Sequence, residues 1–149
     1  MFKILVANGV NLDLLGTRPQ QFYGERSLKD LETFLSQAVT QSFASQVELS
    51  FFQSNDEARY LEFLGQNWDG ALLNPGAWTH TSLALADRLE ALQLPFVEVH
   101  LSHLAKRESW RQASYSSKHS IGVVYGFGFD SYLLGLHGIV RHLLARERI

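Results

Sequence analysis

The sequence predicts one α/β domain in which helices cover both faces of a parallel sheet. Four or five short apolar runs alternate with segments of helical periodicity, and no repeat or linker interrupts them. The 149 residues are enough for one compact domain and too few for two. Strands that alternate with helices at this spacing pair in parallel, because right-handed crossovers place a helix over each strand pair. Five strands in a chain of this length match a flavodoxin-like, three-layer sandwich in size.

The expected elements follow in order along the chain. Ser27-Leu-Lys-Asp30 opens the first helix in the manner of a capping box. The second helix is capped within residues 54–57, and Pro95 closes the third. Strands are expected at residues 3–7, 47–52, 70–73, 96–99 and 121–125, and helices at residues 27–39, 54–64, 79–92 and 130–146.

Composition and charge exclude several functional classes. The absence of cysteine excludes a disulfide framework, a thiolate metal site and a cysteine nucleophile. A net charge of −2 provides no strong field for nucleic acid or anionic lipid. The first apolar stretch turns polar at Asn8, too soon for a signal peptide, and no 18-residue apolar run occurs. We therefore expect a soluble, cytoplasmic protein that binds neither nucleic acid nor membrane.

The aromatic content suggests contacts between subunits. Charged residues make up 19% of the chain, which also carries ten Phe, three Trp and five Tyr. Globular chains usually contain about 25% charged residues. Some of the aromatic side chains are therefore expected to cover contacts between copies of the chain.

Polar residues follow nearly every predicted strand. Ligands of such sheets bind outside the carboxyl ends of the strands, so the site is expected along this edge. Backbone N–H groups in these loops also favour a carboxylate or a phosphate. The strand-end segments are Asn8-Gly9-Val10-Asn11, Asn74-Pro75-Gly76, His100-Leu101-Ser102-His103 and Gly126-Phe127-Gly128.

The first loop and the end of the fourth strand carry candidates for acid and base chemistry. Arg18 and Tyr23 lie in a long aperiodic segment, where a guanidinium would favour the phenolate form of the tyrosine. A surface arginine and a packed tyrosine are the alternative reading. Glu98 and His100 point to the same face of a strand, and a carboxylate beside an imidazole orients it for general acid catalysis.

Other candidate site residues can be explained by a structural role as well as by a functional one. His80 near a helix start is compatible with capping and packing. Arg107 and Arg111 are four residues apart on an expected helical turn and either face a substrate or remain solvated. His100 and His103 lack a third metal ligand nearby. The signatures of dinucleotide sites, phosphate loops and serine hydrolases are incomplete or absent.

Taken together, these motifs closely resemble the type II 3-dehydroquinate dehydratases over almost the whole chain. The resemblance implies a flavodoxin-like fold with strand order 2-1-3-4-5. It also implies loss of water from 3-dehydroquinate in the shikimate pathway, no metal or organic cofactor, and a dodecamer built from trimers. The matching motifs are Asn8-Gly9-x-Asn11-Leu12-x-Leu14-Leu15-Gly16-x-Arg18, Tyr23-Gly24, Gln53-Ser54-Asn55-x-Glu57, Asn74-Pro75-Gly76-Ala77-x-Thr79-His80-Thr81-Ser82, Glu98-Val99-His100-Leu101-Ser102, Arg107-Glu108, Arg111, Tyr125-Gly126-Phe127-Gly128 and Tyr132-Leu133-Leu134.

The resemblance also implies a role for each site residue. Tyr23 would take the proton next to the ketone, Arg18 would hold the phenolate, and Asn11 would position a water on the enolate oxygen. His100, oriented by Glu98, would protonate the departing hydroxyl. Arg107 would belong to the lid or its supports, and Asp87 would reach into a neighbouring subunit. The residues implied to bind substrate are Asn74, His80, Asp87, Leu101, Ser102 and Arg111.

The chain departs from the usual family pattern at several positions, none of them the proposed acid or base. The departures are Val10, Asp13, Asp56, Trp78, Ala86 and Ser131. Two other functions stay open at this point. A non-catalytic protein of this fold would keep the pocket for ligand binding or assembly. A nucleotide- or phosphate-binding regulator is suggested by the glycines at the strand ends.

Overall fold

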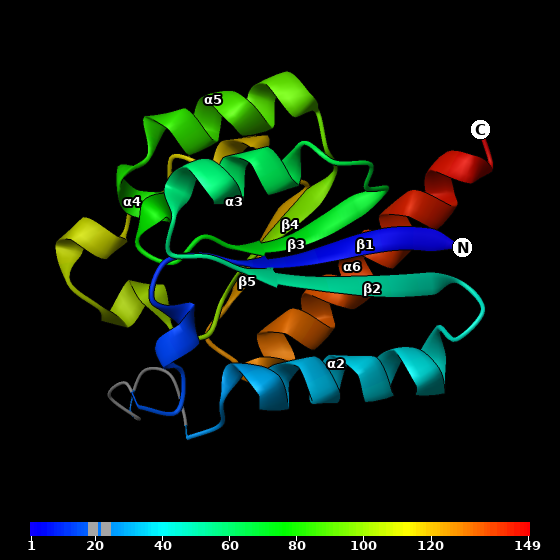
Figure 1. Cartoon of the computed structure of the whole chain (residues 1–149), viewed down its shortest axis with the longest axis horizontal. Helices are drawn as coiled ribbons and strands as arrows, with labels where there is room; N and C mark the ends of the chain where they lie inside the picture. Colours follow the sequence, from blue (N-terminus) through cyan, green and yellow to red (C-terminus); the bar gives the residue numbers. More distant parts are fainter. Residues whose placement is uncertain (18–20, 22–24) are drawn as a thin grey trace.

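The computed structural model describes residues 1–17, 21 and 25–149. Its centre is a five-stranded, all-parallel sheet with order β2-β1-β3-β4-β5 (Figure 1). This confirms the predicted fold class and strand order. The strands are β1 (Phe2–Asn8), β2 (Val47–Gln53), β3 (Gly70–Asn74), β4 (Phe96–His100) and β5 (Gly122–Tyr125).

Helices cover both faces of the sheet. On one side α2 (Leu28–Ser42) and α6 (Phe129–Glu147) pack against the strands, and on the other side α3 (Glu57–Leu64) and α5 (Leu83–Leu92) do so (Figure 1). Successive side chains of a strand point to opposite faces. Ile4 and Val6 of β1 accordingly join the α2–α6 core, whereas Leu5 and Ala7 join the α3–α5 core.

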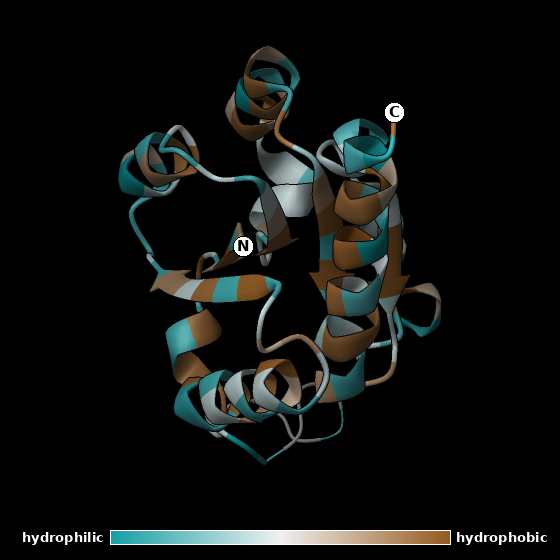
Figure 2. Ribbon diagram, turned by 90° about the vertical axis from the view of Figure 1, so that its right-hand side faces the viewer, coloured by the Kyte–Doolittle hydropathy of each residue, from teal (hydrophilic) through white to brown (hydrophobic). Residues whose placement is uncertain are grey.

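The helices are amphipathic, and α2 begins at the capping residues that the sequence predicted. Figure 2 shows polar and apolar residues alternating around the helices, with apolar residues concentrated on the strands. Ser27 and Asp30 form the expected reciprocal capping box at the start of α2. None of the helices in the described part of the chain is long and apolar enough to cross a membrane.

The helix predicted over residues 79–92 is two helices, and in this respect the prediction is wrong. A short α4 (Trp78–Thr81) ends at Ser82, whose extended backbone separates it from α5. The Ser82 side chain accepts the N–H of Leu85 at 2.9 Å and donates to Glu57 of α3. A serine that satisfies a first-turn N–H competes with helix continuation, so the chain begins a new helix here.

The connection from β4 to β5 differs from the single helical turn expected to carry Arg107 and Arg111. It contains three single-turn 3-10 helices, η2 (Leu104–Lys106), η3 (Ser109–Arg111) and η4 (Ser117–His119). Arg107 has an extended backbone between η2 and η3, so it does not share one helical turn with Arg111. Short 3-10 turns are common connectors between strands and helices. Residues of this segment form part of the wall of the cavity described below.

Candidate active site

A small cavity lies at the carboxyl ends of β1, β3 and β4, as the strand-end rule predicts. Its volume is about 120 Å³. The first loop, the turn after β3, the end of β4 and the η2–η3 segment form its walls. Among the residues proposed from the sequence, those that line the cavity are Asn11, Asn74, His80, His100, Leu101, Ser102, Arg107 and Arg111.

Two glycines allow the loops after β1 and β3 to approach each other. A Cβ on Gly9 would lie 2.4 Å from the Pro75 carbonyl oxygen. A Cβ on Gly76, where φ is +63°, would lie 2.6 Å from the Val10 carbonyl oxygen. The Gly9 N–H donates to Asn74 O at 2.8 Å across this contact. Only residues without a side chain fit here, so the two loops form one continuous wall.

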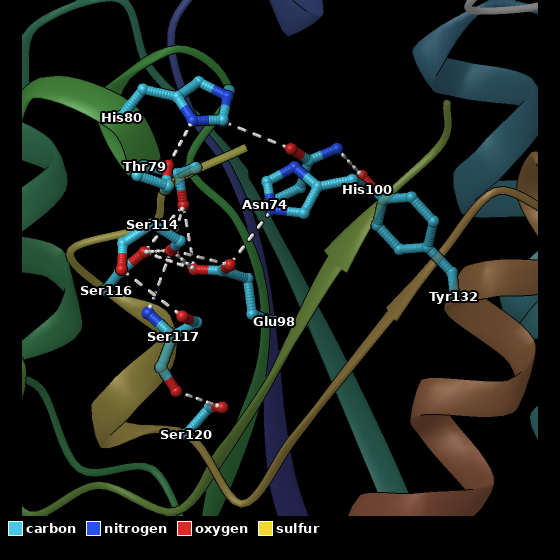
Figure 3. A network of polar contacts seen from close by, with 12 residues as sticks. Asn74, Thr79, His80, Glu98, His100, Ser114, Ser116, Ser117, Ser120 and Tyr132 are labelled. Atoms are coloured by element: carbon cyan, nitrogen blue, oxygen red, sulfur yellow. Dashed lines mark hydrogen bonds and ion pairs between the residues drawn. The ribbon is translucent and has the colours of Figure 1, made fainter. Parts of the chain in front are cut away.

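Glu98 and His100 form a buried pair at the end of β4. The Nε2 atom of His100 lies 3.1 Å from Oε2 of Glu98, and both side chains are buried. This pair confirms the expectation that the two side chains share one face of the strand. Because the carboxylate engages Nε2, the Nδ1 atom is the ring nitrogen left for chemistry; in Figure 3 it points away from Glu98.

Three hydroxyl groups surround the Glu98 carboxylate (Figure 3). Thr79 donates to Oε1 at 2.8 Å, Ser114 donates to Oε2 at 3.0 Å, and Ser116 donates to Oε1. Buried carboxylates of this kind require hydrogen-bond donors to offset their loss of hydration. Burial by itself raises the pKa of Glu98, but the His100 hydrogen bond and charge, with the hydroxyls, outweigh it and hold the pKa below its ordinary value. Glu98 is therefore a carboxylate at neutral pH.

His80 faces His100 across the cavity, with ring centroids 6.4 Å apart. Its Nδ1 lies 2.6 Å from the carbonyl oxygen of Ala113. A carbonyl oxygen only accepts, so Nδ1 carries the proton and neutral His80 keeps Nε2 as an acceptor. Burial lowers the pKa of His80, and the nearby His100 and Arg111 charges act in the same direction, against the Ala113 hydrogen bond. His80 therefore stays neutral at pH 7.

Two arginines supply positive charge at the rim of the cavity. Arg111 donates from Nε to Oε2 of Glu108 at 3.1 Å, and Arg107 lies 3.7 Å from the same oxygen. Arg107 also donates from Nη1 to Ser102 Oγ at 3.2 Å. Glu108 thus places the two guanidinium groups together, although Arg111 belongs to η3 and Arg107 lies in the extended segment before it. Guanidinium groups so placed favour an anionic ligand with several oxygens.

Asn11 enters the cavity with a strained backbone. Its φ is 66°, in the left-handed region that non-glycine residues rarely adopt. The Asn11 N–H donates to Asn55 Oδ1 at 2.8 Å, and Gln53 donates to the same oxygen at 3.1 Å. Gln53 also donates to the Gly9 carbonyl at 3.2 Å. Side chains at the end of β2 therefore hold the first loop in place.

The remaining predicted site residues are not part of the described cavity. Asp87 lies exposed on α5 and does not line it. Arg18 and Tyr23 lie outside the described residues. Over the residues with described positions, no three His, Asp or Glu side chains gather into a group that could hold a metal ion. His103 is exposed and packs edge-on against Tyr125 at 5.6 Å.

Comparison with known proteins decides the family. The model of the family described as "Dehydroquinase class II" matches residues 2–140. The chain belongs to this family. It is an enzyme of the hydro-lyase class, as the family and the names of its relatives indicate.

Curated proteins and solved structures support this membership. The 3-dehydroquinate dehydratase of Carboxydothermus hydrogenoformans is 45% identical over 150 residues, which cover 97% of this chain and 94% of that protein. The one from Geotalea daltonii is 44% identical over 144 residues, which cover 95% and 98%. The crystal structure of the type II dehydroquinase from Butyrivibrio crossotus has a TM-score of 0.85 at 31% identity, covering 93% of this chain and 97% of that one.

Most departures from the usual dehydroquinase pattern have a local structural role. Val10 lines the cavity, and Ala86 is buried in α5. Asp56 caps α3 by accepting the Arg59 N–H at 3.2 Å. Trp78 packs against Tyr60 with ring centroids 5.3 Å apart, and Ser131 accepts the Phe127 N–H at 2.9 Å. Asp13 is exposed in η1 (Leu12–Leu14).

Sequence reasoning missed several residues that build this dehydroquinase site. The buried hydroxyl of Thr79 donates to Glu98, a contact that no sequence pattern indicated. Ser114 and Ser116 complete the same cluster, yet they lie in a segment without apolar periodicity. The one available signal was the concentration of serines between β4 and β5, which does not say where their hydroxyls point.

Proposed function

We propose that this chain eliminates water from 3-dehydroquinate to give 3-dehydroshikimate. The observation that carries the proposal is the buried Glu98–His100 pair on the wall of a small, positively edged cavity, in a chain of the dehydroquinase class II family. The pair supplies an oriented general acid, and the arginines suit a substrate that carries a carboxylate and hydroxyl groups.

The substrate carboxylate is proposed to bind at the ends of β3 and β4. Asn74 and the backbone N–H groups of Leu101 and Ser102 would contact it, since all three residues line one side of the cavity. His80 and Arg111 would contact the ring hydroxyls. Neutral His80 can accept a hydroxyl proton at Nε2, and Arg111 can donate to a hydroxyl oxygen.

The reaction is proposed to proceed through an enolate. The Tyr23 phenolate, held by Arg18, would remove the proton next to the ketone, so the C–H bond breaks and charge moves to the carbonyl oxygen. A water positioned by Asn11 would stabilise that oxygen. The enolate then collapses, the bond to the C1 hydroxyl breaks, and His100 gives that hydroxyl a proton so that it leaves as water. The role of Tyr23 and Arg18 rests on their match to the family pattern.

Glu98 is proposed to act on His100 and not on the substrate. The hydrogen bond at Nε2 fixes the ring so that Nδ1 delivers the proton. The hydroxyls of Thr79, Ser114 and Ser116 support this role because they keep the carboxylate ionised in a buried place.

Assembly belongs to the same proposal. We infer a cytoplasmic homo-oligomer, a dodecamer in the pattern of the family, that serves the shikimate pathway. Exposed apolar side chains along β5 and α6 support subunit contacts: Val123 is 41% exposed, Phe127 64% and Leu134 49%. Asp87 faces outward, as a residue that reaches a neighbouring site must. Light scattering should give the mass of an oligomer, and a monomer would contradict this part of the proposal.

The decisive experiment is a turnover assay with 3-dehydroquinate. Purified wild-type protein should produce the conjugated enone, seen as rising ultraviolet absorbance. Tyr23→Phe should abolish turnover while substrate binding persists. Folded protein that binds 3-dehydroquinate without any rise would favour a non-catalytic binding protein. Thermal stabilisation by nucleotides but not by 3-dehydroquinate would favour the regulator.

A further inference from the structure

Three buried, uncharged side chains connect the cavity to the body of the fold. Asn8 ends β1 and Asn74 ends β3, and the two are direct partners in the parallel register. Tyr132 lies in the first turn of α6. Asn8, Asn74 and Tyr132 are 2%, 4% and 0% exposed. Of the three, Asn74 alone appears among the described residues that line the cavity.

The order of donors and acceptors in this group is fixed at its Gly76 end. The Gly76 N–H donates to Asn74 Oδ1 at 3.1 Å, and because a backbone N–H only donates, Oδ1 must face Gly76. The Asn74 Nδ2 atom then donates to the Tyr132 hydroxyl at 2.8 Å (Figure 3). That hydroxyl donates its own proton to Asn8 Oδ1 at 2.5 Å. The chain of bonds therefore runs from Asn74 through Tyr132 to Asn8.

This order decides what Asn74 presents to a ligand. An asparagine amide that rotates freely can offer either an oxygen or an N–H, and only the N–H attracts an anion. Tyr132 takes one of the two hydrogens on Nδ2, so the second hydrogen is the one available to the cavity. Burial raises the pKa of Tyr132 far above its ordinary value, so the phenol stays protonated at any pH of interest.

We propose that Tyr132 is a positioning residue for carboxylate recognition, which holds the Asn74 amide with an N–H directed at the ligand. Asn8 supports it by fixing the direction of the phenol proton. This inference rests on the proposed function, in which Asn74 binds the substrate carboxylate. Tyr132 is not a lining residue of the described cavity, so it acts only through Asn74.

The test is Tyr132→Phe, which keeps the packed ring and removes the hydroxyl. The Asn74 amide loses one of its two anchors, and the substrate carboxylate should bind more weakly before and during the reaction. KM for 3-dehydroquinate should therefore rise five- to twentyfold, while kcat stays within twofold. This pattern is expected when a variant loses a contact that stabilises the bound substrate and the transition state equally.

Tyr60→Phe is the matched control. Tyr60 is also 0% exposed, and its hydroxyl donates to the Ala7 carbonyl at 2.9 Å on the α3–α5 side of the sheet. The Tyr60→Phe variant removes a buried tyrosine hydroxyl, as Tyr132→Phe does, but that hydroxyl makes no contact with Asn74. Its KM should equal that of wild type, although its thermal unfolding temperature falls. Equal rises in KM for both variants would mean general loosening and would overturn the proposal.

A second variant covers the case in which Tyr132→Phe does not fold. Asn8→Leu removes the acceptor and leaves the phenol proton without direction, so KM should rise two- to fivefold. Wild-type turnover separates the two ideas. If wild type is inactive, the proposed function fails; if wild type is active and the folded variants keep its KM, or lose kcat alone, only the role of Tyr132 fails.

Discussion

The two sides of the cavity differ in charge: one is built around a carboxylate and the other from uncharged side chains. On the β4 side, the Glu98 carboxylate pairs with His100 and is enclosed by hydroxyl groups. On the β1–β3 side, the link from Asn74 through Tyr132 to Asn8 contains no charge at all. Both are buried.

In the proposed function, this difference separates proton transfer from recognition. The charged side can change protonation state, so its contribution must depend on pH. The neutral side has no group that titrates near neutrality, so its contribution is a fixed geometry. Buried polar groups are costly unless they are fully satisfied, and the chain satisfies one side with hydroxyls around a carboxylate and the other with a single phenol.

The largest expected effect is that of His100→Asn on catalysis. The variant removes the proposed acid, and kcat should fall by about 10²- to 10⁴-fold. The measurement is steady-state turnover of 3-dehydroquinate with folding checked by circular dichroism. His103→Asn is the control, because His103 is exposed and contacts Tyr125 rather than the cavity. A decrease below tenfold in His100→Asn would contradict its role as the acid.

Glu98→Gln tests the charged side through stability. The amide cannot accept all the bonds that the carboxylate accepts, so the free energy of unfolding at pH 7 should fall by about 1–3 kcal/mol. The pKa of Glu98 is lowered in the folded state, so the carboxylate stabilises the fold above about pH 4.3, the ordinary value for Glu. That advantage should disappear as pH falls through the lowered pKa.

Urea unfolding of wild type and Glu98→Gln from pH 7 to pH 3 measures this difference. The two stability curves should converge below about pH 4.3. Glu90→Gln, at an exposed position on α5, should follow wild type at every pH. Curves for Glu98→Gln and wild type that stay parallel throughout would show that the carboxylate charge does not stabilise the fold.

Asn55→Ala should have a smaller effect, because Asn55 does not line the cavity and acts on it only through Asn11. The Asn11 N–H and the Gln53 amide lose their shared acceptor, which costs about 1 kcal/mol of stability. The strained Asn11 backbone should then relax, and kcat/KM should fall about three- to tenfold, or roughly 1 kcal/mol. Asn67→Ala, at an exposed position, is the control. An unchanged kcat/KM would mean that Gln53 alone holds the loop.

The smallest expected effect concerns pH: the change in KM caused by Tyr132→Phe should not depend on it. The ratio of KM in Tyr132→Phe to KM in wild type should stay constant within twofold between pH 6 and pH 8, because the Asn8–Tyr132–Asn74 link carries no titrating group in that range. A KM ratio that follows pH would break the distinction between the two sides.

Much of the framework was predictable from local patterns. Apolar runs, helical periodicity and the Ser27–Asp30 capping box depend on neighbouring residues, and they predicted the strands and most helices. The pairing of Glu98 and His100 was predictable because residues two apart on a strand share a face. The break at Ser82 was not, since a serine inside a helical pattern is equally compatible with a cap and with a continued helix.

The sequence by itself determined the fold class, the edge of the sheet that carries the cavity, and the shared face of Glu98 and His100, because periodicity and parallel pairing constrain these directly. Only the tertiary structure decided which hydroxyls enclose Glu98 and how the Asn74 amide is oriented. Ser116 lies 18 residues from Glu98, and Tyr132 lies 124 residues from Asn8. A hydrogen bond depends on direction and distance between atoms, which only the packed layers bring to within 3 Å of each other.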